Sequence, residues 1–262
     1  MIIKKLQHPT KSEKILSDSN DFSLPLRSMN EVFDNTIVLK SVKIKNSYIC
    51  DRRYFAGSEV IRKKDIEKIC EKMNIPDKAL KEITSIDFID QCWIGVQQTN
   101  NETAYRAYFG NFDEHSSEGH GKAIEWKING KRFKVREYFG SKITSLGDLK
   151  NESLNILNHD SDINNIIFQL ILGLSSEEKI LSETNLIRSK SRKRNTLDMS
   201  LRFLNKDIYQ IRSQLSAIFE SFNLMKHEYY KIFLHPTVRM QIGRIQWGID
   251  SDGEKFVNLY YV

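Results

Sequence analysis

Hydrophobic and polar residues alternate along much of the chain, which is the period of a β-strand with one buried face. The pattern is clear at the C-terminus, where Ile245 and Trp247 alternate with Arg244 and Gln246. Other segments are rich in branched and aromatic residues, which favour strands. Together these signals predict strands at 36–45, 86–98, 103–112, 123–128, 131–139, 196–203, 242–249 and 254–262.

Short turn sequences join several of these strands into hairpins. Asn129-Gly130 separates 123–128 from 131–139, and both residues tolerate the positive φ of a two-residue hairpin turn. Ser251-Asp252-Gly253 stands before the last strand, and Asn100-Asn101 lies between two earlier ones. Hairpin connections produce antiparallel pairs, so we expect a large antiparallel sheet.

Helical periodicity appears in three places between the strands. Segment 58–73 has apolar residues at helical spacing, with Ser58 as the expected N-cap and Pro76 beyond its end. Segment 141–187 carries two short apolar faces and is expected to be helical and loop-like. Segment 206–224 has the most regular pattern, with apolar residues at Ile208, Ile211, Leu215, Ile218 and Phe222.

The order of these elements predicts an α+β fold, with a large antiparallel sheet of β-hairpins flanked by amphipathic helices. The regular alternation of strand and helix that builds a parallel sheet is absent from the pattern. Residues 1–28 are polar and lack a sustained period, so we expect an irregular N-terminal arm. Residues 29–262 are expected to form a single α+β domain.

Composition supports a globular chain with a positive charge. Hydrophobic residues make up 40% of the 262 residues and charged residues 28%, which is outside the disordered class. The net charge of +6 favours an anionic small molecule, an acidic peptide or nucleic acid as partner. No segment reaches the roughly 18 apolar residues of a membrane helix, so we expect a soluble cytoplasmic protein without membrane insertion.

Cysteine and histidine spacing does not predict a metal site. Cys50, Cys70 and Cys92 are far apart in the sequence and are expected to be buried as small apolar residues. His115 and His120 lie five residues apart in a polar segment, where a metal site is one interpretation and an ordinary loop the other. No recognised catalytic acid, base or nucleophile motif is present.

Cationic side chains on the strands are the main candidates for a binding site. Arg132, Lys134, Arg136 and Tyr138 share one face of their strand and can bind a diphosphate through charge-assisted hydrogen bonds. The alternative is a solvated face with cross-strand partners such as Glu125. In the last hairpin, Arg244 and Gln246 share one face of a strand, as do Asn258 and Tyr260, and an amphipathic edge hairpin is the alternative.

Two further segments contain residues that can bind anions. The basic stretch 188–194 can contact nucleic acid or an anionic peptide, or form a solvated loop. Residues 119–122 (GHGK) lack the spacing of a nucleotide-binding phosphate loop and are expected to form a connector before the hairpin.

Two strand-turn-strand segments resemble a known family. CWIGVQQTNNETAYRAYFGNF (92–112) and IGRIQWGIDSDGEKFVNLYYV (242–262) are similar to the paired strands of the ABBA-barrel prenyltransferases, which act on aromatic and peptide acceptors. RNTLDMSLRF (194–203), followed by a helix, is similar to another strand of that family. The resemblance implies a closed barrel of ten strands, built from αββα units with the helices outside.

The resemblance also implies a function and a set of site residues. It implies transfer of a prenyl group from an isoprenoid diphosphate, as substrate rather than cofactor, to an aromatic or peptide acceptor. The implied diphosphate-binding residues are Arg106, Lys134, Arg136, Arg202 and Arg244, and the residues implied to shield the allyl cation are Tyr108 and Tyr260. A non-catalytic protein that binds nucleic acid or an anionic peptide through a basic sheet face is the alternative.

Overall fold

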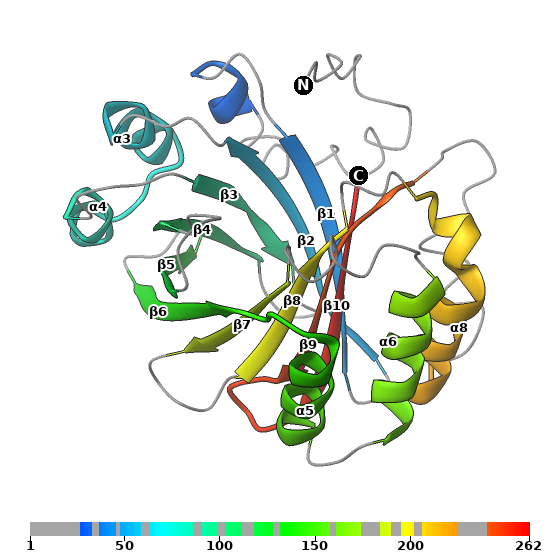
Figure 1. Cartoon of the computed structure of the whole chain (residues 1–262). Helices are drawn as coiled ribbons and strands as arrows, with labels where there is room; N and C mark the ends of the chain where they lie inside the picture. The colour runs from blue at the N-terminus through cyan, green and yellow to red at the C-terminus, as the bar shows by residue number, and fades with distance from the viewer. Residues whose placement is uncertain are drawn as a thin grey trace. The chain divides into compact units, whose positions relative to one another are not determined.

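In the computed structural model, the ten strands among the described residues form one closed antiparallel ring, with the order β1-β10-β9-β8-β7-β6-β5-β4-β3-β2 (Figure 1). The fold is therefore an α+β barrel, and the closure implied by the resemblance is confirmed. The structure describes residues 27–32, 37–45, 48–58, 63–85, 91–98, 103–111, 118–127, 132–157, 161–173, 184–189, 195–201, 206–224 and 240–262.

The strands match most of the segments that the alternating pattern predicts. They are β1 (Ile37–Lys45), β2 (Tyr48–Ser58), β3 (Gln91–Gln98), β4 (Thr103–Asn111), β5 (Glu118–Lys127), β6 (Phe133–Lys142), β7 (Thr184–Ser189), β8 (Asn195–Ser200), β9 (Ile242–Ile249) and β10 (Lys255–Tyr261). The helices are α3 (Lys63–Lys72), α4 (Asp77–Thr84), α5 (Leu146–Ile156), α6 (Ser161–Gly173), the 3₁₀ helix η2 (Ile208–Ile211) and α8 (Arg212–Ser221). None of the described helices is long and apolar enough to cross a membrane.

The chain divides into two compact units, and the division falls within strands β1, β2, β5 and β6. Unit 1 comprises residues 1–38, 53–111 and 121–135, and unit 2 comprises 39–52, 112–120 and 136–262. Each unit has its own apolar core. The expectation of a single domain over 29–262 stays a prediction.

The core of unit 2 lies between its strands and helices α5, α6 and α8. Strands β8, β9 and β10 contribute alternate residues, among them Leu197, Ile245, Trp247 and Leu259, all completely buried. These strand residues form one apolar cluster with residues of the three helices. A polar contact adds to the apolar one, because the Trp247 indole donates a hydrogen bond of 2.8 Å to the Ser153 hydroxyl of α5.

The core of unit 1 lies between β3, β4, β5 and helices α3 and α4. Cys92, Ile94 and Val96 of β3 face it, together with Cys70 of α3 and Trp126 of β5. The expected burial of cysteines is confirmed for Cys70 and Cys92, and burial raises the pKa of the Cys70 thiol to about 12. A thiol with so high a pKa is an inert core residue at neutral pH.

Helix boundaries follow local capping more closely than apolar periodicity. The Ser145 side chain accepts a hydrogen bond from the Asp148 backbone at the start of α5. Asp207 and Gln210 form a reciprocal capping box at η2, so the predicted helix at 206–224 begins with a 3₁₀ turn and continues as α8. The prediction of Ser58 as an N-cap is wrong, because Ser58 ends strand β2 and helix α3 begins at Lys63.

Other predictions need correction in their extent. Residues 119–122 are part of strand β5 and not a connector. Segment 141–187 contains helices α5 and α6 as expected, but it ends in strand β7, which the helical pattern concealed. Strand β2 and helix α4 were not predicted as separate elements. Residues 1–26 and the turns at 100–101 and 129–130 lie outside the described residues.

Gly248 gives the first testable prediction, since the close approach of β9 to β8 requires a glycine there. Its φ is +150°, and a Cβ atom would lie 2.2 Å from the Asn195 carbonyl oxygen. We expect Gly248→Ala to lower the free energy of unfolding by about 2–3 kcal/mol, through backbone strain and steric overlap. Urea unfolding measures the change. Gly253→Ala, in the β9–β10 turn with open space around its Cβ, is the control for strain without overlap and should cost less.

Candidate functional site

The strand face of unit 2 that points away from its helices is polar, and we call it the inner face. Antiparallel register places its residues in rows that cross the strands. One row, the Lys43 row, consists of Lys43 of β1, Asn258 of β10, Gln246 of β9, Asp198 of β8 and Asn185 of β7. The first four residues are at most 9% exposed, although each is polar or charged. Buried polar groups require partners, so this face is an organised network.

The neighbouring row, the Ser41 row, consists of Ser41 of β1, Tyr260 of β10, Arg244 of β9 and Ser200 of β8. Arg244 and Tyr260 are direct cross-strand neighbours, and a register shift follows at once between Tyr260 and Tyr261. Such bulges re-aim side chains and are common beside functional sites. The structure therefore brings together Arg244 and Tyr260, two of the residues predicted from the sequence.

An ion pair and a hydrogen bond connect the two rows. The Nε of Arg244 lies 3.1 Å from a carboxylate oxygen of Asp198, which also accepts a hydrogen bond of 3.1 Å from the amide nitrogen of its own neighbour Gln246. Asn258 donates to the phenol oxygen of Tyr260 at 2.7 Å. The amide and carboxylate side chains of the Lys43 row thus fix the orientation of the two large side chains in the Ser41 row.

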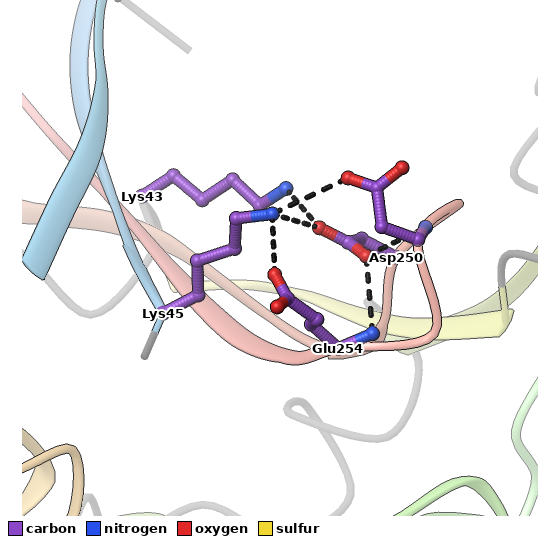
Figure 2. A network of polar contacts seen from close by, with 5 residues as sticks. Lys43, Lys45, Asp250 and Glu254 are labelled. Atoms are coloured by element: carbon purple, nitrogen blue, oxygen red, sulfur yellow. Dashed lines mark hydrogen bonds and ion pairs between the residues drawn. The ribbon is translucent and has the colours of Figure 1, made fainter. Parts of the chain in front are cut away.

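A cluster of charges holds β1 to the turn between β9 and β10 (Figure 2). The ammonium groups of Lys43 and Lys45 each lie 3.0 Å from the same carboxylate oxygen of Asp250, and Lys45 also reaches Glu254 at 2.7 Å. The other oxygen of Asp250 accepts hydrogen bonds from the backbone N–H groups of Asp252 and Glu254. Asp250 therefore closes the turn and binds the first strand at the same time.

The charges in this cluster shift the protonation of its members. Burial by itself raises the pKa of Asp250, but the positive charges of Lys43 and Lys45 outweigh it and hold the pKa at about 2. Burial by itself lowers the pKa of Lys45, but hydrogen bonds to Glu254 and Asp250 outweigh it, so the pKa lies above the usual range. Asp250 and Lys45 are therefore both charged at neutral pH.

Asp250, Asp252 and Glu254 also have the geometry of a cation site. Their carboxylate oxygens lie within 4.8 Å of one another. The Lys45 ammonium contacts all three carboxylates, at 3.0, 3.4 and 2.7 Å. The position that a metal ion would take already holds the positive charge of a lysine, so the cluster serves to join strands.

Lys43 also lies against an aromatic ring of the inner face. Its ammonium group is 4.6 Å from the centre of the Phe256 ring, within the range of a cation–π contact. Phe256 is two residues from Asn258 on the same strand and is 1% exposed. An apolar ring thus adjoins the polar rows on the inner face.

In unit 1, Arg106 and Tyr108 lie together on the face of β4 opposite its core. The Arg106 guanidinium donates to the Tyr108 hydroxyl at 3.1 Å and forms an ion pair with Glu125 of β5. The Phe55 ring packs against Tyr108 with 5.6 Å between ring centres. From the sequence, Glu125 was a candidate partner for the cations on β6. In the structure it forms its ion pair with Arg106.

Two of the remaining predicted site residues lie on β6. Lys134 and Arg136 share one face of β6, where Lys134 is exposed and Arg136 is partly buried. Arg202 lies outside the described residues, as do residues 190–194 of the basic stretch and His115. His120 lies in β5 and stacks on Phe139 at 5.1 Å. Its environment is that of an aromatic pair at the surface.

Sequence reasoning missed the buried polar residues of the inner face. Ser41, Lys43 and Asp198 carry no motif, and their roles depend on which residues face them across the strands. One signal was available, because polar residues alternate with apolar ones at 41–45 and 196–203. Asp250 stands immediately before a predicted turn, which is a position where an aspartate often binds the backbone.

Comparison with known proteins adds a likeness of fold. No protein-family model and no curated protein matches the sequence. Among solved structures, the chain is similar to AnaPT from Neosartorya fischeri, with 10% sequence identity and a TM-score of 0.45 over 86% of this chain and 77% of that one.

Asp250 gives a prediction about stability and pH. Its pKa is lower in the folded protein than its ordinary value of 3.8, so its charge stabilises the fold above pH ~4. We expect this contribution, about 2 kcal/mol, to be lost as the pH falls from ~4 through ~2. Urea unfolding of wild type and Asp250→Asn over this range measures it as the difference between the two proteins.

Taking the difference in free energy of unfolding between wild type and Asp250→Asn cancels the contribution of the other carboxylates. At neutral pH, Asp250→Asn should be the less stable protein, and the two should converge below pH ~2, where the side chain at position 250 is neutral in both. Asp252→Asn is the matched control, since its side chain is 68% exposed. A constant difference across the whole pH range would contradict the role of the Asp250 charge.

Proposed function

We propose that the protein transfers a prenyl group from an isoprenoid diphosphate to an aromatic or peptide acceptor. The observation that carries this proposal is the inner face of unit 2, where cationic groups adjoin aromatic rings. Arg244 lies beside Tyr260, and Lys43 lies over the Phe256 ring. Arg244 and Tyr260 take the roles of diphosphate binder and cation shield.

The chemistry of prenyl transfer needs both kinds of group. When the bond between the allylic carbon and the diphosphate oxygen breaks, the electron pair leaves with the diphosphate and the carbon becomes cationic. Fixed positive charge stabilises the leaving group, and the face of an aromatic ring stabilises the cation. An electron pair of the acceptor then forms the new bond to the allylic carbon, and the acceptor loses a proton.

The organisation of Arg244 favours this role. Asp198 uses the Nε of the guanidinium, which has further N–H groups on its two terminal nitrogens for an anion. The Arg244 side chain is 33% exposed, while Asp198 is 6% exposed. Arg244 is therefore accessible to a ligand and is held in place by a buried partner.

The other residues predicted from the sequence keep their proposed roles, but their surroundings differ from those of Arg244. Arg106 and Tyr108 combine a cation and a phenol in unit 1, but Arg106 is 4% exposed and its charge is offset by Glu125. Lys134 and Arg136 offer positive charge on β6. We propose Arg244 as the first residue to test, because its surroundings are the most complete.

The test is turnover of allylic diphosphates, measured as pyrophosphate release with indole, phenol and peptide acceptors. Arg244→Gln keeps a hydrogen-bond donor for Asp198 and removes the charge. We expect it to lower turnover by about 100-fold, since one fixed donor to the developing anion is lost. Unfolding in urea checks that the variant remains folded.

Arg188→Gln is the matched control. Arg188 lies on β7 among the same strands, is 55% exposed and contacts Glu152 of α5, so it faces the helices and not the inner face. Its turnover should equal that of wild type. Equal turnover of the two variants would remove Arg244 from the site. Absence of prenyl transfer, with retention of nucleic acid that weakens steeply with salt, would instead support the non-catalytic binding protein.

A further inference from the structure

The buried hydroxyl of Ser41 has no hydrogen-bond partner among the described residues. Ser41 is 1% exposed, and its Oγ makes no hydrogen bond there. Burying a hydroxyl without a partner is unfavourable, so each such group in a native fold requires an explanation. Side chains of a strand stand roughly perpendicular to the sheet, and the Ser41 hydroxyl therefore projects from the inner face.

The neighbours of Ser41 are hydrogen-bond donors. Tyr260 lies directly across from it, and Arg244 and Ser200 follow on the next two strands. Asn258 donates to the oxygen of Tyr260, which directs the tyrosine O–H proton elsewhere. The row thus presents hydroxyl and guanidinium donors on one face, with the positive charge of Arg244 among them.

We infer that Ser41 donates a hydrogen bond to a phosphate oxygen of the bound diphosphate, and that the Ser41 row forms one anion subsite with Arg244 and Tyr260. The inference rests on the proposed function for the identity of the ligand as an organic diphosphate. No sequence motif marks Ser41, and its role follows from burial and register alone.

The dimensions of the row fit a ligand with several acceptor oxygens. Ser41 and Arg244 are two strands apart, roughly 10 Å between Cα atoms. A serine side chain is short and an arginine side chain is long, so one ligand must extend between them over Tyr260. A phosphate or diphosphate offers acceptor oxygens in several directions, which suits donors that come from different strands.

Lys43 is excluded from this subsite by its own contacts. It lies two residues along β1 from Ser41, but its ammonium group is bound to Asp250 and lies over Phe256. Asp198 limits Arg244 on the same side, because it pairs with the Nε and not with the two terminal nitrogens of the guanidinium. The anion subsite is therefore confined to the Ser41 row and does not extend into the Lys43 row.

The experiment is titration of the full chain with inorganic pyrophosphate by isothermal calorimetry, for wild type and Ser41→Ala. We expect the variant to bind about tenfold more weakly, the usual effect of removing a hydrogen bond to a charged group. In the absence of pyrophosphate, its midpoint of urea unfolding should be unchanged or higher, because the lost hydroxyl had no partner in the fold. Ser41→Thr keeps a hydroxyl on a strand and should restore most of the affinity.

Ser28→Ala is the matched control. Ser28 is also 1% exposed with a hydroxyl that makes no hydrogen bond among the described residues, but it lies in the helical turn at 27–30 of unit 1. It lies outside the Ser41 row, so pyrophosphate affinity should remain that of wild type. The comparison separates the effect of removing any buried hydroxyl from the effect of removing one in the subsite.

The inference is overturned if wild type does not bind pyrophosphate, if Ser41→Ala binds it as wild type does, or if that variant's urea midpoint falls. Its failure is distinguishable from failure of the proposed function. Prenyl transfer that depends on Arg244, with full pyrophosphate affinity in Ser41→Ala, supports the function and removes Ser41. Pyrophosphate affinity that depends on Ser41, without prenyl transfer, supports the subsite and assigns it to another organic diphosphate.

Discussion

The pairing of the first strand with the last is the constraint on which the barrel depends. Residues of β1 and the β9–β10 turn are separated by more than 200 positions, with 207 between Lys43 and Asp250. Closing so long a stretch of chain costs conformational entropy that local contacts do not return. The backbone ladder between β1 and β10 and the buried ion cluster of Lys43, Lys45 and Asp250 together supply specific long-range contacts. A slipped register would leave buried charges unpaired, at a cost of several kcal/mol.

A buried polar face is harder to stabilise than an apolar one, so the composition of the inner face is relevant to function. Apolar residues on both faces of these strands would have been sufficient for stability, as in sheets covered on two sides. Here the outer positions of β8, β9 and β10 are apolar and pack on helices, while Asp198, Gln246 and Asn258 are buried on the other face. Each makes a specific hydrogen bond to a neighbour. Networks of this kind fix side-chain orientation, which a binding site requires before its ligand arrives.

Both units place an arginine beside a tyrosine and oppose it with a carboxylate. In unit 2 the carboxylate of Asp198 holds Arg244, and in unit 1 Glu125 holds Arg106. The carboxylate orients the guanidinium and offsets part of its charge, so each arginine attracts an anion less strongly than an unpaired one would. The greater exposure of Arg244 makes unit 2 the more accessible of the two.

The sequence by itself determined the period of each strand, and therefore which residues would share a face. Arg244 with Gln246 and Asn258 with Tyr260 follow from alternation, as do the apolar residues that meet the helices, because side chains of a strand point to opposite faces in turn. Only the tertiary structure decided which strands are neighbours. Lys43 meets Asp250, and Ser41 meets Tyr260, through pairing of β1 with β10. Alternation has a period of two residues and carries no information about partners two hundred positions away, so the rows of the inner face exist only in the folded barrel.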